Sequence, residues 1–319
     1  MKKSNLTENN FEVSHVVKTL TDNGYIERLP DNYNQELFLD TETLLKFIKS
    51  TQPEEWEKLH EQSPDNTEDV FLKRVSGEIN KRGTLDVLRN GIKDRGAKFE
   101  LAYFKPVSGL NPEHEKLYRQ NKFTVIRQLP FSQKYQKTLD ISIFLNGIPI
   151  ITSELKNHFT GQDYTDAIKQ YKYTRDPKEP FLKRCLVHFA LDNDKAYFAT
   201  QLEGEITQFL PFNKDIENPE DKRGFKGAYL YHDIWHPNSL LEIIYQYIQI
   251  AEKEDLKTGK KTKKIIFPRF HQLTAVKQIV DSTRKSGAGK NYLIQHSAGS
   301  GKTFTISWLG HQLSQIHDK

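Results

Sequence analysis

The stretch TLDISIFLNGIPIITSELK, residues 138–156, decides the fold. Apolar residues alternate with a period of two on both sides of Asn146-Gly147, a dipeptide typical of the tight turn between two antiparallel strands. The sequence therefore predicts a β-hairpin here. In its second strand, the same period places Glu154 and Lys156 on one face and Leu155 on the other.

The register of this hairpin determines which side chains meet. A two-residue turn with an unbroken ladder would leave Asp140 opposite Ser153, with Glu154 on the other side of the sheet. Asp140 comes beside Glu154 only if the hairpin contains one extra residue, as a bulge or an odd-length loop. We predict that residue near Gly147, because left-handed backbone geometry costs least at glycine.

Two carboxylates and an amine at this spacing suit metal-dependent cleavage of phosphodiester bonds. Asp140 and Glu154 would hold Mg²⁺, with the Leu155 carbonyl as a third ligand. The metal polarises the phosphate and lowers the pKa of a bound water, which Lys156 would position. The spacing alone is loose, because an exposed hairpin with a surface glutamate and lysine gives the same pattern. A following helix would bring Gln170 near the cleft.

A second motif lies near the end of the chain. The apolar run 292–296 predicts a buried strand, SAGSGKT at 297–303 predicts a glycine loop, and the residues from 304 predict a helix. A nucleotide phosphate loop requires this order, although His296 stands where the usual pattern has glycine. The glycines would admit the phosphates, the lysine would reach their oxygens and the threonine would bind Mg²⁺. The predicted nucleotide-binding residues of the loop are Gly299, Ser300, Gly301, Lys302 and Thr303.

Length and composition set the organisation around these motifs. The 319 residues exceed one average domain, and 36% apolar residues are enough to build a core. The lysine-rich stretch 252–264 predicts a solvated linker. A membrane helix needs about 18 consecutive apolar residues, and no run approaches this length. A single cysteine, Cys185, excludes an internal disulfide and fits the cytoplasm. Helices are predicted at 13–20, 41–51, 68–89, 163–173 and 239–251, and further strands at 99–104, 123–129, 185–191 and 196–200.

Taken together, these residues resemble known families. Asp140, Glu154-Leu155-Lys156 and Gln170 look like the core of the PD-(D/E)XK nucleases. With RGTLDVLR at 82–89, LAYFKP at 101–106 and the glycine loop, nearly the whole chain resembles the restriction (R, HsdR) subunit of type I restriction–modification enzymes.

This resemblance implies a fold and a function. The fold would be α/β, with a mixed-sheet nuclease core flanked by helices over 1–251, the linker 252–264, and the first part of a RecA-like P-loop motor domain over 265–319. The chain would be an N-terminal fragment of an enzyme that cleaves double-stranded DNA after ATP-driven translocation. Its cofactors would be Mg²⁺ and ATP, and its partners DNA and the methyltransferase and specificity subunits. The segment Phe267–Gln272 resembles the adenine-sensing segment of superfamily 2 helicases, in which Gln272 would bind the base.

Several assignments stay open at this point. Glu12 and Glu78 are both candidates for an assisting glutamate, and the role of Tyr173 is undecided because the family's Gln-x-x-x-Tyr spacing is not kept. A catalytically silent module that holds DNA, or an accessory domain of a helicase, would share many of these features. Contacts to DNA phosphates are expected from basic residues around the cleft, which are Lys134, Lys137, Lys169, Lys172 and Arg175.

Overall fold

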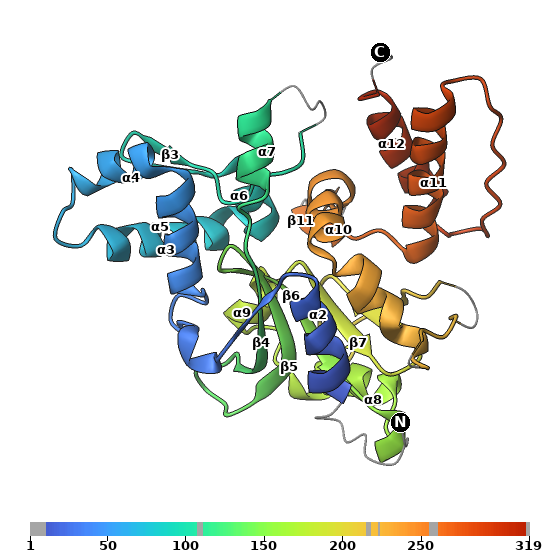
Figure 1. The fold of residues 1–319 in the computed structure, drawn as a ribbon. Helices are drawn as coiled ribbons and strands as arrows, with labels where there is room; N and C mark the ends of the chain where they lie inside the picture. Colours follow the sequence, from blue (N-terminus) through green and yellow to red (C-terminus); the bar gives the residue numbers. More distant parts are fainter. Residues whose placement is uncertain (1–10, 107–110, 215–217, 223, 255–260, 317–319) are drawn as a thin grey trace.

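The computed structural model describes residues 11–106, 111–214, 218–222, 224–254 and 261–316 (Figure 1). A seven-stranded sheet in the order β1-β4-β5-β6-β7-β8-β9 forms its centre. The β1–β4 and β6–β7 pairs are parallel and the other neighbours are antiparallel, so the predicted α/β class with a mixed sheet is confirmed. The strands are β1 (Ile26–Arg28), β2 (Ile92–Asp94), β3 (Ala97–Phe99), β4 (Phe123–Pro130), β5 (Thr138–Leu145), β6 (Ile148–Leu155), β7 (Val187–Leu191), β8 (Ala196–Ala199), β9 (Leu210–Pro211), β10 (Gln249–Glu254) and β11 (Lys261–Ile266).

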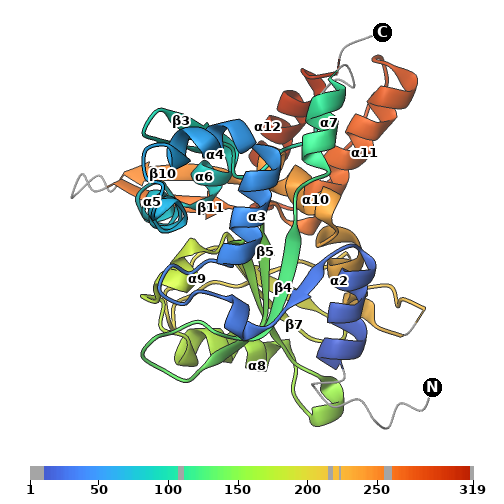
Figure 2. The ribbon, with the colours of Figure 1, turned by 60° about the vertical axis from the view of Figure 1, so that its left-hand side comes forward.

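Helices flank this sheet on both sides. The sheet lies between α2 and α9 (Figure 2), while α3 to α6 gather beyond one end of the strands (Figures 1 and 2). None of the described helices is long and apolar enough to cross a membrane. The α-helices are α2 (Lys18–Asp22), α3 (Thr41–Thr51), α4 (Pro53–His60), α5 (Thr67–Arg82), α6 (Thr84–Asn90), α7 (Pro112–Tyr118), α8 (Tyr164–Lys169), α9 (Pro180–Arg184), α10 (Pro237–Glu242), α11 (Phe270–Ser286) and α12 (Lys302–Leu313). The tighter and wider helical turns are η2 (Glu12–Val17), η3 (Pro30–Asn32), η4 (His158–Thr160), η5 (Gln170–Thr174), η6 (Lys226–Ala228), η7 (Leu230–Ile234) and η8 (Ile243–Tyr247).

Apolar side chains cover both faces of the sheet. Val125 and Ile143 belong to the larger hydrophobic cluster, whereas their chain neighbours Ile126 and Phe144 belong to a smaller one. Successive residues of a strand point to opposite faces, so the two clusters lie on opposite sides. This two-sided cover explains why every residue of β6 is buried.

The central hairpin contains the extra residue that the sequence predicts. Asn146 and Gly147, with φ of +50° and +82°, form a two-residue turn, and the ladder then shifts by one residue at Ile150. The insertion is confirmed, but its predicted place near Gly147 is wrong, because the turn itself is regular. Pro149 precedes the bulge and has no N–H to contribute to the ladder, which makes this the point where pairing is most easily interrupted.

The stretch 252–264, predicted as a solvated linker, contributes to two paired strands instead. The described residues of 252–264 lie in β10 and β11, which pair antiparallel, while 255–260 lie outside the described residues. Glu252 stands opposite Lys263 and forms an ion pair with it at 3.4 Å. Opposite charges on facing strands stabilise a hairpin, and this pair is such a contact in the described part of the stretch.

The segment 292–296, predicted as a buried strand, forms no strand, and its Leu293 is 94% exposed. No described strand pairs with it, so its backbone N–H and C=O groups have no ladder to join. The predicted helix after the glycine loop is present as α12, which packs beside α11 (Figure 1). The ring centres of Trp308 in α12 and Tyr247 are 5.7 Å apart.

Candidate active site

The bulge brings the start of β5 and the end of β6 together in the register that the site needs. Beyond Ile150, Ile141 pairs with Ser153, so Asp140 stands beside Glu154. The Oδ2 atom of Asp140 accepts a hydrogen bond from the backbone N–H of Leu155 at 2.8 Å. One carboxylate is therefore held against the strand that carries the other.

Glu154 is the most buried member of this group, with 0% of its surface exposed. Its Oε1 atom accepts a hydrogen bond from Nε of Arg175 at 2.7 Å, and its Oε2 atom has no hydrogen-bond partner among the described residues. Burial and then the charge of Asp140 raise the pKa of Glu154, while Arg175 and Lys156 act in the opposite direction. The structure thus brings Asp140, Glu154 and Lys156 into one electrostatic neighbourhood.

A third carboxylate joins them from η2. Glu12 is buried and accepts hydrogen bonds from Nε of Arg127 at 2.7 Å and from Nε2 of Gln128 at 3.2 Å. Burial raises the pKa of Glu12, and the nearby charge of Asp140 raises it further. Glu78, the other candidate from the sequence, pairs instead with two arginines of its own helix, α5. The geometry therefore brings Glu12, and not Glu78, to the site.

Gln128 is a site residue that sequence reasoning missed. Its amide nitrogen donates to Oδ1 of Asp140 at 3.2 Å as well as to Glu12, and so bridges the two carboxylates. Its backbone has a φ of +48°, which is uncommon outside glycine. No local pattern marks a glutamine for this role, because the two acids that it joins lie far apart in the sequence.

The donor set suits a hard divalent cation. Among the described residues, no three His, Cys, Asp or Glu side chains lie close enough together to enclose a metal. Mg²⁺ requires less, because it takes one or two carboxylates and completes its coordination with water and substrate phosphate. The unpartnered Oε2 of Glu154 and the carboxylate of Asp140 are oxygen donors of this kind. Solvent reaches the group at Asp140, which is half-buried, and at Gln128, which is exposed.

Two residues before Glu154, side-chain hydrogen bonds of Thr152 link β6 to η5 and β7. Thr152 Oγ1 lies 2.8 Å from the hydroxyl of Tyr171 and 2.7 Å from Nδ1 of His188. Burial lowers the pKa of His188 to about 3, so this imidazole is neutral. Gln170 begins η5 and is half-buried, whereas Tyr173, whose role the sequence left open, is 63% exposed. The tyrosine at the site is thus Tyr171.

The predicted DNA contacts divide into surface residues and one buried residue. Lys134, Lys137 and Lys169 are exposed and Lys172 is half-buried. Lys137 donates to the Thr174 carbonyl at 3.1 Å, which places the loop before β5 next to η5. Arg175 differs from the expected surface position, because only 6% of it is exposed and it binds Glu154.

A comparison with known families assigns the chain. The family described as "Type I restriction enzyme R protein N terminus" matches residues 5–206, which are more than half of the chain. The chain belongs to this family. The matched part of this R protein N-terminal region contains the carboxylates, Lys156, Gln170 and Arg175, whereas the glycine loop lies outside it.

Curated relatives of this R protein region are endonuclease subunits by name. It is 28% identical over 257 residues to the putative type I restriction enzyme MjaVIIIP endonuclease subunit of Methanocaldococcus jannaschii, covering 75% of this chain and 23% of that protein. It is 26% identical over 207 residues to the SauCOLORF180P subunit of Staphylococcus aureus, covering 64% and 20%. It is 25% identical over 273 residues to the HindI subunit of Haemophilus influenzae, covering 80% and 25%. The chain therefore spans a quarter or less of the length of these relatives.

In the glycine loop, the lysine side chain donates hydrogen bonds to nearby backbone carbonyls. Gly299 and Gly301 have φ of +72° and +82°, a backbone geometry that favours glycine. Nζ of Lys302 donates to the carbonyls of His296 at 3.0 Å and Ser297 at 2.9 Å. Ser300 is buried in the loop, and Thr303 is exposed in the first turn of α12.

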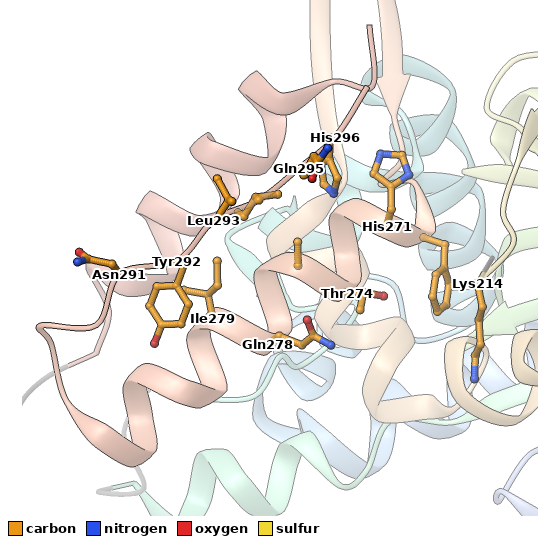
Figure 3. Close-up of a pocket in the computed structure, with 13 residues that line it drawn as sticks. Lys214, His271, Thr274, Gln278, Ile279, Asn291, Tyr292, Leu293, Gln295 and His296 are labelled. Carbon is orange, nitrogen blue, oxygen red and sulfur yellow. The ribbon is translucent and has the colours of Figure 1, made fainter. Parts of the chain in front are cut away.

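Gln272, predicted to bind adenine, contacts the loop itself. Its side chain is buried and donates to the carbonyls of Ser300 at 3.1 Å and Gly301 at 2.9 Å. Beside it, a hollow of about 620 Å³ lies between α11 and residues 291–296, with the rings of His271 and His296 4.6 Å apart at one end (Figure 3). None of the site carboxylates lines this hollow.

Proposed function

We propose that this chain is the nuclease module of a type I restriction enzyme, with a PD-(D/E)XK core, joined to the first part of its ATP-driven motor. The module cleaves phosphodiester bonds of double-stranded DNA with Mg²⁺ after translocation. The observation that carries the proposal is the meeting of Asp140 and Glu154 at one end of the β5–β6 pair, where Lys156 follows two residues after Glu154. The endonuclease subunits to which the chain is similar support it.

Each residue of the group has a distinct role in this function. Asp140 and Oε2 of Glu154 hold the cation. When bound, Mg²⁺ polarises the phosphate and lowers the pKa of a water molecule. Lys156 orients the attacking water and offsets the negative charge that develops on the phosphate. Glu12 acts through Gln128, whose amide fixes the second oxygen of Asp140.

DNA approaches the site from the side on which Asp140 and Gln128 meet solvent. In this proposal, lysines of the loop before β5 and of α8 and η5 contact the DNA phosphates. Such contacts position a duplex without reading its sequence, so target recognition belongs to the specificity subunit. The phosphate-contacting residues are Lys134, Lys137, Lys169 and Lys172.

The glycine loop serves the motor in this proposal. Lys302 and the backbone N–H groups of residues 299–303 bind ATP phosphates, Thr303 binds the Mg²⁺ of the nucleotide, and Gln272 senses the adenine. The complete enzyme works in the cytoplasm, assembled with methyltransferase and specificity subunits.

A lysine substitution in the assembled enzyme tests the nuclease assignment. Lys156→Ala should abolish DNA cleavage and leave ATP hydrolysis unchanged, because the lysine belongs to the carboxylate group and not to the glycine loop. Lys18→Ala, at an exposed lysine that pairs with Asp22, is the matched control and should cleave normally. Normal cleavage by Lys156→Ala would refute the assignment. An unsubstituted enzyme that binds DNA and never cuts it would identify a silent module that only holds DNA.

A further inference from the structure

Arg175 is a buried cation at the edge of the carboxylate group. It follows η5, and each of the three nitrogens of its guanidinium donates a hydrogen bond. Nε donates to Oε1 of Glu154 at 2.7 Å, Nη2 to the carbonyl of Thr138 at 2.8 Å, and Nη1 to Oγ1 of Thr174 at 3.2 Å. The guanidinium carbon also lies 5.4 Å from the centre of the Phe131 ring. These contacts fix the guanidinium in one place.

This arrangement selects one oxygen of Glu154 for a ligand. Arg175 occupies Oε1, so Oε2 is the atom without a hydrogen-bond partner among the described residues. Because Arg175 is tied to Thr138 at the start of β5, the same side chain couples Glu154 of β6 to the strand that carries Asp140. Arg175, which lies outside the hairpin, therefore helps to fix the position of Glu154 relative to Asp140.

The charge of Arg175 also matters, because a buried carboxylate beside a second one is costly without a cation. A guanidinium close to a metal site affects binding in two opposite ways. It holds the ligand oxygen in position, which strengthens binding, and its charge repels the metal, which weakens binding. Which effect is larger decides its role.

We infer that Arg175 is a positioning residue of the nuclease centre, holding Glu154 by Oε1 so that Oε2 is presented to a divalent cation. The inference rests on the function proposed above and adds a residue to its site. It also assigns Arg175 away from the DNA-contacting surface, because only 6% of the residue is exposed and all three of its nitrogens donate inside the protein.

Mn²⁺ binding to the purified chain, followed by the electron paramagnetic resonance signal of free Mn²⁺, tests this role. Arg175→Met keeps most of the side-chain volume and removes every donor, and it should weaken Mn²⁺ binding by about tenfold to a hundredfold. Arg175→Lys keeps the charge and one donor nitrogen but loses the forked donors, so it should bind Mn²⁺ several-fold more weakly than the unsubstituted chain and more tightly than Arg175→Met. Unchanged or tighter binding by Arg175→Met would overturn the inference, because it would show that repulsion outweighs positioning.

A second buried arginine provides the control for folding. Arg184 donates to Oδ1 of Asn80 at 3.0 Å and to Oγ of Ser76 at 2.8 Å, and it stacks on Phe38 at 4.9 Å. Arg184→Met should lower the melting temperature about as much as Arg175→Met and leave Mn²⁺ affinity unchanged. If Arg175→Met does not fold, Arg175→Lys decides, since the loss of the forked donors should still weaken binding several-fold, and unchanged affinity would overturn the inference.

The Asp140→Asn variant separates this inference from the proposed function. If the unsubstituted chain binds Mn²⁺ and Asp140→Asn does not, the measured site is the carboxylate group, and the Arg175 variants test positioning alone. If the unsubstituted chain binds no Mn²⁺, or Asp140→Asn binds it equally well, the metal-dependent function fails and the role of Arg175 fails with it.

Discussion

Asp140 and Leu155 are joined by a hydrogen bond between a carboxylate oxygen and a backbone N–H, 2.8 Å long, although they lie at opposite ends of a hairpin sequence. The bond exists because the bulge at Ile150 shifts β6 by one residue against β5. Without that shift Asp140 would face Ser153, and the two carboxylates would lie on different faces of the sheet. A single inserted residue thus creates the site.

The Asp140→Asn variant tests the charge at this position separately from its geometry. The amide oxygen of asparagine can still accept the Leu155 N–H, so the melting temperature should change by no more than a few degrees. The loss of one anionic ligand should reduce Mn²⁺ affinity at least tenfold and abolish cleavage by the assembled enzyme. Asp22→Asn, at an exposed carboxylate, should change neither property. Full cleavage by Asp140→Asn would exclude Asp140 as a ligand.

The turn of the hairpin predicts a large effect on stability. Gly147 has a φ of +82°, and a Cβ at this position would lie 2.3 Å from the carbonyl oxygen of Asp40. Gly147→Ala should therefore lower the free energy of unfolding by about 2–4 kcal/mol, measured by urea denaturation. Gly96 has a φ of +87°, and a Cβ added there would have nothing within 4 Å. Gly96→Ala therefore measures the cost of a positive φ for alanine without a steric clash. Equal effects of the two substitutions would contradict the steric explanation.

Burial of His188 predicts a dependence of stability on pH. Its folded pKa of about 3 lies below the ordinary 6.5, so the unfolded chain takes up a proton at mildly acidic pH and the folded chain does not. The contribution of neutral His188 to the free energy of unfolding is complete above pH 6.5 and is lost as the pH falls towards 3. Between pH 7 and pH 5 the loss should be about 2 kcal/mol.

The variant His188→Gln isolates this contribution, with urea denaturation at both pH values as the measurement. The raised pKa values of Glu12 and Glu154 favour the folded state as pH falls, and they act in both proteins. The pH 7 to pH 5 change in the free energy of unfolding should therefore differ between the unsubstituted chain and His188→Gln by the contribution of His188 alone. An identical fall in stability in both would show that His188 is not the group responsible.

Much of the region around the carboxylate group could be predicted because its signals are local. The alternation on each side of Asn146-Gly147 defines two strands and a turn, and the pairing requirement of Asp140 and Glu154 demands one inserted residue. The place of that insertion could not be predicted, since it depends on how β6 pairs. The burial of Arg175 was missed because a charged residue ordinarily lies in solvent, and its partner Glu154 is 21 positions away.

Short apolar runs were the weakest signals. The run 99–104 predicted a strand, yet β3 ends at Phe99, and Leu101 and Phe104 are buried in irregular backbone. Periodicity does not distinguish these cases in so short a run. The run 292–296 has the composition of a strand, but a strand forms only beside another, and no described strand pairs with it.

The glycine loop offers a comparison within one chain. Lys302 lies within the loop 297–303 and donates to the carbonyls of His296 and Ser297. Lys290 ends the similar sequence SGAGK at 286–290 and donates to the Ser286 hydroxyl. Only Lys302 also begins a helix, α12, whose N-terminus favours phosphate. Lys302→Ala should therefore abolish ATP hydrolysis by the assembled enzyme and, with it, translocation-dependent cleavage.

Lys290→Ala removes the same charge from the neighbouring loop and should leave both activities unchanged. ATP hydrolysis measured by phosphate release, and cleavage of a plasmid that carries the recognition sites, together provide the readouts. Because Lys302 lies outside the carboxylate group, Lys302→Ala should also bind Mn²⁺ at that group as tightly as the unsubstituted chain. Equal loss of ATP hydrolysis in the two variants would mean that overall charge, and not the geometry of the loop, governs nucleotide binding.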